Sequence, residues 1–316
     1  MLEALLLLML ASACLIAATQ KVIRVIIYFG VFSIITATCF LLLAAPDVAM
    51  AKGVIDVFAT IFLIICFEKF YDFQTEDPTG SRGAAAKESS RFRAHILPLG
   101  FTALLFGLFL YFVPSYAFNP YLQDLYVARF MPDVGGYNAV TAIYLGYRVY
   151  DTLFEALVLL IGALAVIHMS LYTETAVSDG KHSDIERYQI AAFPIRTLSP
   201  LFLLFGTYLI LNGIFTPGGG FQGGVAVAMF FVGRYMIYDI YDLPVERIAT
   251  AKKYIFFALV LAATLVVFIG IGTQIPLAHV PLLQNTYLTL MNILIGGKVA
   301  CGFLVLFYRY VAIERR

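Results

Sequence analysis

Residues 151–172 read DTLFEALVLLIGALAVIHMSLY, an apolar run that is long enough to cross a lipid bilayer. A transmembrane helix needs about 20 predominantly apolar residues. The run begins with two carboxylates, Asp151 and Glu155, which are four residues apart and therefore share one face of a helix. These residues predict a membrane-spanning helix with acidic side chains close to one end.

The composition of the chain extends this prediction to the whole protein. Hydrophobic residues make up 61% of the 316 residues and charged residues 13%, whereas about 25% of a soluble domain is charged. The 21 basic and 20 acidic residues nearly balance, which argues against nucleic acid as a partner, because nucleic-acid binding needs a basic face. We therefore predict an all-α, polytopic membrane protein surrounded by the lipid bilayer.

Apolar stretches bounded by proline, glycine or polar residues predict about nine transmembrane helices. They cover residues 2–19, 22–45, 47–70, 94–114, 151–172, 194–215, 221–240, 251–274 and 286–311. This pattern divides the chain into blocks of three, two and four helices, at 1–72, 94–175 and 176–316. We expect the polar residues 73–93 to form a flexible cytoplasmic linker. The aromatic segment 115–150 is expected either to lie at the outer interface or to fold partly back onto the helices.

The distribution of basic residues predicts the orientation of these helices. With the N-terminus outside, 17 of the 21 Lys and Arg residues, Lys252 among them, lie on the inner side. Only Arg129 and Arg148 lie on the outer side, and Lys52 and Lys298 fall within predicted helices. Because short inner loops are enriched in Lys and Arg, we predict the N-terminus outside and the C-terminus inside, in the inner (cytoplasmic) cell membrane.

Charged residues within the third predicted helix allow two interpretations. Lys52 and Asp56 are four residues apart and can form an ion pair on one helix face. That pair is either a neutralising structural contact or part of a charged relay that tunes the position of a proton or cation. Asp47 follows Pro46 at the start of the helix, where a carboxylate typically caps free N–H groups.

The fifth predicted helix carries the main candidates for an ion path. Glu155 is either a structural partner of Arg148 or a carboxylate that binds a proton or, transiently, Na⁺; Asp151 has the same alternatives. His168 is either a histidine at a helix end or a member of a relay. These side chains need partners or water, because a charge at the bilayer centre costs about 2.5 to 3.5 kcal/mol.

Two further features lie near the C-terminal end of the chain. Lys298 lies within the apolar run NILIGGKVACG (292–302), where it needs an acceptor and serves either an interface or an ion path. The glycine-rich segment TPGGGFQGG (216–224) predicts a tight helical hairpin or, alternatively, an ion-coordinating loop. Its motif residues are Pro217, Gly218, Gly219, Gly220, Phe221 and Gln222.

Cofactor chemistry has no recognisable ligand set in this sequence. The four cysteines are each isolated in apolar runs, without a Cys-x-x-Cys pair, at positions Cys14, Cys39, Cys66 and Cys301. This spacing excludes a recognisable iron–sulfur or zinc site. We expect no cofactor, no tightly bound metal and no catalytic centre in this chain.

Three motifs resemble components of Mrp-type Na⁺/H⁺ antiporters. LNGIFTPGGGFQGG (211–224), together with NILIGGKVACG, resembles MrpB. GGYNAVTAIYLGYRVYDTLFEALVLLIGALAV (135–166) resembles the end of MrpA, and LLLAAPDVAMA (41–51) is similar to the part of MrpA before it. The whole arrangement looks like a fusion of the MbhD-, MbhE- and MbhF-like subunits of membrane-bound hydrogenases.

This resemblance implies a protein that takes part in Na⁺ translocation coupled to H⁺ movement within a complex. The implied partners are MrpC-, MrpD-, MrpE-, MrpF- and MrpG-like proteins and an antiporter-like protein. An alternative is a structural adaptor in a redox-driven, hydrogenase-like pump, without an ion path of its own. Glu155 matches the glutamate of the family pattern RxxDTxxE, whereas Lys52 replaces a family glutamate and puts that position in doubt.

Overall fold

A computed structural model describes most of the chain, and every regular element in the described residues is helical. The described residues are 2–19, 21–70, 100, 104–108, 111, 120–173, 189–238, 245–273 and 281–312. The predicted linker 73–93 and most of the predicted helix 94–114 lie outside them. The principal helices are α1 (Leu2–Ala18), α2 (Val22–Leu42), α3 (Pro46–Phe70), α5 (Tyr121–Asp133), α6 (Ala139–Ala142), α7 (Val149–Thr173), α8 (Gln189–Asn212), α9 (Gly220–Tyr238), α10 (Val245–Thr273) and α11 (Pro281–Ala312).

Four of the described helices are long and apolar enough to cross a membrane. The qualifying spans are Val22–Leu42, Val149–Met169, Arg247–Phe268 and Gln284–Arg309, and Leu2–Ala18 and Ser199–Asn212 are shorter apolar helices. These helices confirm the prediction of an all-α, multi-pass membrane protein. The count of nine helices and the orientation of the termini stay predictions.

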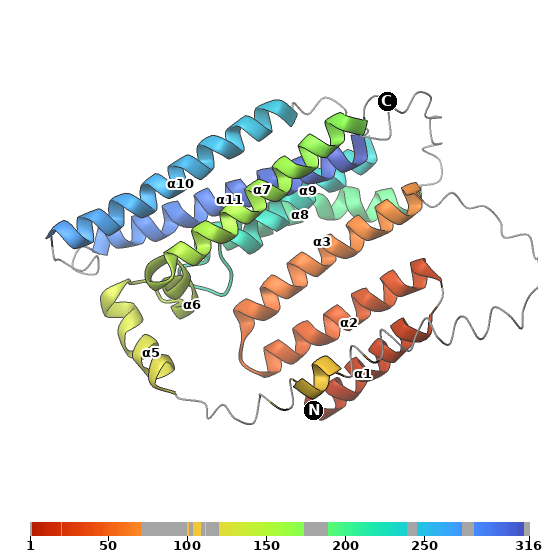
Figure 1. Cartoon of the computed structure of the whole chain (residues 1–316), viewed down its shortest axis with the longest axis horizontal. Coiled ribbons are helices and arrows are strands. Elements are labelled where there is room, and N and C mark those ends of the chain that lie inside the picture. The colour runs from red at the N-terminus through yellow and green to blue at the C-terminus, as the bar shows by residue number, and fades with distance from the viewer. Residues whose placement is uncertain are drawn as a thin grey trace, which may run out of the picture. The chain divides into compact units, whose positions relative to one another are not determined.

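Helix α11 is the centre of the larger of two compact units. This unit comprises residues 1–68 and 126–316, and the other comprises 69–125. Within the larger unit α11 packs against α7, α9 and α10 (Figure 1). In the most apolar 18-residue stretch of α11, 61% of the residues are buried within the chain, whereas in the corresponding stretches of α2, α7 and α10 the share is 17%. The outer helices therefore leave most of their apolar surface for lipid or for partner proteins.

Glycines allow α9 and α11 to approach each other closely. A Cβ atom on Gly224 of α9 would lie only 2.5 Å from the carbonyl oxygen of Gly296 in α11. On the other side of α9, a Cβ atom on Gly206 of α8 would lie 2.8 Å from the carbonyl oxygen of Gly223. Small residues at such contacts are typical of packed transmembrane helices. They make α8, α9 and α11 the tightest part of the bundle.

The segment before α7 is more structured than an interfacial loop. It contains α5, a reversal at Gly135 and Gly136 with φ of 84° and 82°, the short α6, and a π-helical turn η2 (Ile143–Tyr147). The Asn138 side chain caps α6 by accepting hydrogen bonds from the N–H groups of Val140 and Thr141. This capped turn fixes the start of α7 at Val149, two residues before the predicted start.

Candidate functional site

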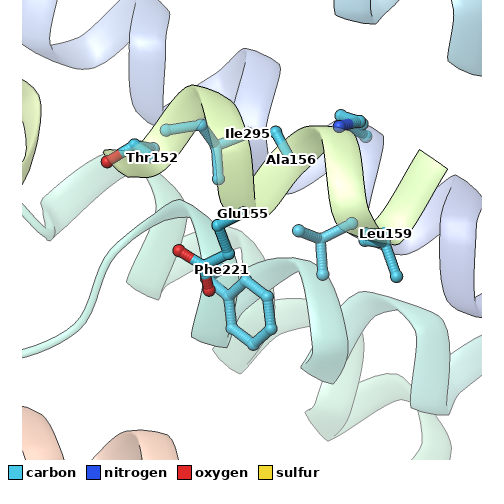
Figure 2. Close-up of a pocket in the computed structure, with 8 residues that line it drawn as sticks. Thr152, Glu155, Ala156, Leu159, Phe221 and Ile295 are labelled. Carbon is cyan, nitrogen blue, oxygen red and sulfur yellow. The ribbon is translucent and has the colours of Figure 1, made fainter. Parts of the chain in front are cut away.

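A small cavity between α7, α9 and α11 brings the two main charged candidates together. Its volume is about 10 Å³, which is room for about one water molecule. Figure 2 shows the Glu155 carboxylate beside the ring of Phe221, with Thr152 and Ile295 nearby. The lining residues are Thr152, Glu155, Ala156, Leu159, Phe221, Ile295, Lys298 and Val299.

Glu155 contributes the carboxylate at this cavity. Its neighbour on the helix surface, Arg148, pairs with Asp151 instead, with 2.5 Å between Arg148 Nε and Asp151 Oδ2. Both members of that pair are exposed, with side-chain exposures of 63% and 59%. The structural alternative predicted for Glu155, pairing with Arg148, therefore applies to Asp151. Glu155 is itself exposed at the surface of this chain, and it is one of the residues that line the cavity.

Lys298 contributes the opposite charge from the interior. Its side chain is 0% exposed, and its Nζ forms no hydrogen bond with any described residue. The ammonium group lies 4.3 Å from the ring centroid of Phe256 and interacts electrostatically with Glu155. A desolvated cation over an aromatic ring is stabilised by about 2 kcal/mol. Within this chain Lys298 lies over a ring face and interacts with the carboxylate residue Glu155, and its pairing with a carboxylate or carbonyl of this or another chain stays a prediction.

Hydrogen bonds connect the glycine-rich segment to the cavity. The N–H of Gly220 and the hydroxyl of Tyr144 both donate to Asn292 Oδ1, at 3.1 Å and 2.9 Å. The hydroxyl of Thr152, which lines the cavity, donates to the carbonyl of Tyr144 at 2.8 Å. Sequence reasoning missed these three side chains. The one local signal was Asn292, a polar residue at the start of an apolar run.

A second polar cluster joins three segments that are far apart in the sequence. Asp47 Oδ1 accepts hydrogen bonds from Asn138 Nδ2 and from the N–H of Gly218, each at 3.0 Å. Asn138 Nδ2 also donates to the carbonyl of Thr216 at 3.0 Å. Asp47 lies in the first turn of α3, as predicted, but its bonds reach across to two other segments. The cluster therefore holds α3, α6 and the α8–α9 connection together.

We expect Asn138→Ala to weaken this cluster measurably. The substitution leaves one hydrogen bond on Asp47 Oδ1, frees the Thr216 carbonyl and removes the cap of α6, which lowers the free energy of unfolding by about 1–3 kcal/mol. The midpoint of thermal unfolding of the purified protein in detergent measures this loss. Asn285→Ala, at an exposed position in α11, is the matched control. Equal midpoints for the two variants would contradict the assignment.

The remaining charged candidates do not line the cavity. Lys52 Nζ lies 2.5 Å from Asp56 Oδ2, and the hydroxyl of Ser33 donates to the same carboxylate. The pair is thus neutralised within α2 and α3. His168 is exposed near the end of α7, about 20 Å along the helix from Glu155. Within the described residues, no three His, Cys, Asp or Glu side chains gather as a metal-binding group.

The glycine-rich segment forms the tight hairpin between α8 and α9. Gly218 has a φ of 134°, a conformation that favours glycine. Its N–H donates to Asp47, and that of Gly220 donates to Asn292. Phe221, the first residue after this turn, lines the cavity, whereas Pro217 and Gln222 are partly buried. The segment therefore links the two polar clusters.

Two family models match separate parts of the chain. Residues 190–314 match MnhB, described as a "Domain related to MnhB subunit of Na+/H+ antiporter". Residues 7–72 match MbhD, which is described as the D component of MBH. Both matches confirm the resemblance that the motifs indicate.

Among similar proteins, a probable K(+)/H(+) antiporter component of the A/B type from Rhizobium meliloti (strain 1021) is 24% identical over 233 residues. The match covers 67% of this chain and 23% of that relative, so the chain spans about a quarter of its length. A chain of the Mrp complex from Dietzia sp. DQ12-45-1b has the same fold, with a TM-score of 0.60 at 18% identity over 95% of this chain and 34% of that one. For a chain of the archaeal membrane-bound sulfane sulfur reductase, the TM-score is 0.51 at 21% identity, over 70% of this chain and 97% of that one.

Proposed function

Because the chain is a fusion of Mrp-type antiporter domains, MbhD-like in residues 7–72 and MnhB-like in residues 190–314, we propose that it is a membrane subunit of a multisubunit complex that exchanges a cation for protons. One observation carries this proposal. Glu155 and the fully buried Lys298, two residues of opposite charge, line the same small cavity in an otherwise apolar bundle.

The opposite charges at this cavity supply a physical reason for coupled exchange. A cation such as Na⁺ at Glu155 and a proton on Lys298 place two positive charges near one cavity, so each opposes the other. The coupling is reciprocal, because a cation that disfavours the proton is itself disfavoured by the proton. Binding of Na⁺ therefore promotes release of H⁺, as an antiporter requires. In this scheme Asp151, His168 and the Lys52–Asp56 pair lie outside the cation-binding step.

The position of Glu155 supports a role within a larger complex. Its side chain is exposed on this chain, and direct contact of a charged carboxylate with lipid is energetically costly. A neighbouring protein that covers α7 and brings polar groups or water removes that cost. We propose that the other members of the complex are MrpC-, MrpD-, MrpE-, MrpF- and MrpG-like proteins and an antiporter-like protein.

For the topology we propose about nine crossings, with the N-terminus outside and the C-terminus inside the inner cell membrane. The 17 to 2 distribution of basic residues supports this orientation. The proposed blocks remain 1–72, 94–175 and 176–316, with the linker at 73–93. In this arrangement α7 begins at the outer side, so Glu155 lies about one helix turn inside the membrane.

A structural adaptor in a redox-driven pump is the second candidate function. The cluster of Asp47, Asn138 and Gly218 favours it, because this cluster joins three segments without lining the cavity. An adaptor needs Glu155 and Lys298 only for assembly. A component of the ion path needs them for transport in a complex that is already assembled.

Inverted membrane vesicles test the proposed function directly. Vesicles are prepared from cells that express the complex with or without this chain, and a pH gradient is imposed on them. We expect added Na⁺ or K⁺ to dissipate the gradient only in vesicles that contain the chain, as followed with a pH-sensitive dye. Equal responses of the two kinds of vesicle, with the partner proteins present in both membranes, would refute the proposal. Comparison of Na⁺ with K⁺ identifies the cation.

A further inference from the structure

A second fully buried lysine, Lys252, lies in α10, the helix that packs against the α11 helix of Lys298. Lys252 in α10 is 0% exposed, and its Nζ forms no hydrogen bond with a described residue. A lysine seven residues into a helix ordinarily extends its side chain to the membrane surface. The burial of Lys252 therefore needs another explanation.

The packing of α10 on α11 determines what faces Lys252 (Figure 1). The two helices are antiparallel. Phe256 lies under Lys298, and Lys252, one turn earlier in α10, interacts electrostatically with Cys301, which is about one turn later in α11. Residues four apart share one helix face, so Lys252 and Phe256 both face α11. Lys298 interacts electrostatically with both Lys252 and Glu155.

The order of these groups along the bundle gives them a direction. Leu159 of α7 lies beside Gly302 of α11, and Glu155 shares the cavity with Lys298, so α7 and α11 are parallel. Glu155 and Lys298 are therefore level with each other, and Lys252 lies about one turn nearer the end of the bundle where α7 and α11 finish and α10 starts. The ammonium groups of the two lysines repel each other. Neither of them finds a hydrogen-bond acceptor among the described residues. Such an arrangement favours a state in which only one of the two lysine amines is protonated at a time, over a state in which both carry a charge.

We propose that Lys252 is a proton-carrying residue, which accepts a proton from Lys298 on the path that starts at Glu155. This inference rests on the proposed function. The N–H bond at Lys298 breaks, its electron pair stays on the Lys298 nitrogen, and the proton binds the lone pair of the neutral Lys252 amine. The carboxylic acid of Glu155 then returns a proton to Lys298 and becomes the carboxylate that receives the cation. Lys252 releases its proton toward the end of the bundle where α10 begins.

The test uses the assembled complex in inverted vesicles, with Na⁺ or K⁺ added to an imposed pH gradient. Lys252→Met keeps the aliphatic stem and removes the amine, and we expect the cation-driven proton flux to fall by about a hundredfold. Lys253→Met, at the exposed neighbouring position, is the matched control and retains wild-type flux. The amount of complex recovered with an affinity-tagged partner protein reports assembly for both variants. Wild-type flux in Lys252→Met would overturn the inference.

A second substitution separates proton transfer from a fixed positive charge. Lys252→Arg keeps the charge, but its guanidinium does not release a proton, so we expect the flux to stay low while the complex assembles. Wild-type flux in Lys252→Arg would overturn the inference even if Lys252→Met failed to assemble. The proposed function fails separately, if the wild-type complex itself shows no flux with either cation.

Discussion

Glu155→Gln is expected to lower cation-driven proton flux by about a hundredfold while the complex still assembles. The amide has nearly the same shape as the carboxyl group but neither carries a proton nor attracts a cation as a charge. Lys298 would then line the cavity without the opposite charge that it now faces. The measurement is the initial rate of gradient dissipation in inverted vesicles, normalised to the amount of assembled complex.

Glu3→Gln provides the matched control for this experiment. Glu3 is an exposed glutamate in the first turn of α1, so the same chemical change there leaves the flux at the wild-type rate. A structural adaptor makes the opposite prediction for Glu155→Gln, namely normal flux or loss of assembled complex. Normal flux in an assembled complex would therefore remove Glu155 from the ion path and favour the adaptor.

Gly224→Ala is expected to destabilise the bundle by forcing α9 and α11 apart. Its Cβ would lie 2.5 Å from the carbonyl oxygen of Gly296 and 2.8 Å from Val299 Cβ. Because one of these neighbours is backbone, the two helices must move apart, which costs about 1–3 kcal/mol. The midpoint of thermal unfolding in detergent, read by size-exclusion chromatography of the remaining folded protein, measures the loss.

The same substitution at Gly162 of α7 should have the opposite sign. A Cβ atom at Gly162 meets no atom within 4 Å, and alanine is favoured over glycine within a helix by about 0.5–1 kcal/mol. We therefore expect Gly162→Ala to raise the midpoint and Gly224→Ala to lower it. If both variants raised the midpoint, intrinsic helix propensity rather than helix packing would govern stability at these positions.

The helices themselves were predictable, because hydrophobic length is a local property. The apolar runs that became α2, α7 and α11 each exceed the length that a bilayer requires. The acidic start of α7 and the lysine in the middle of α11 were visible for the same reason. Each stands out against its immediate neighbours, without knowledge of the fold.

The contacts between these residues were not predictable, because they depend on packing. The bond from Asn138 to Asp47 spans 91 residues and that from Gly218 to Asp47 spans 171, and local periodicity contains no information about such pairs. The burial of Lys252 was not predictable for a related reason. Near the start of a helix it resembles an orienting residue of the inner membrane face, and only the packing of α10 on α11 places it in the interior.

The central position of α11 has a consequence for biosynthesis. Glu155 leaves the ribosome 143 residues before Lys298, which at ordinary rates of synthesis is an interval of roughly 7–30 s. The rest of α7 and then α9 are made during that interval, and the helix that completes the cavity with them, α11, is made last. The carboxylate must therefore enter the membrane without Lys298, and a neighbouring protein or the insertion machinery has to shelter it until α11 arrives.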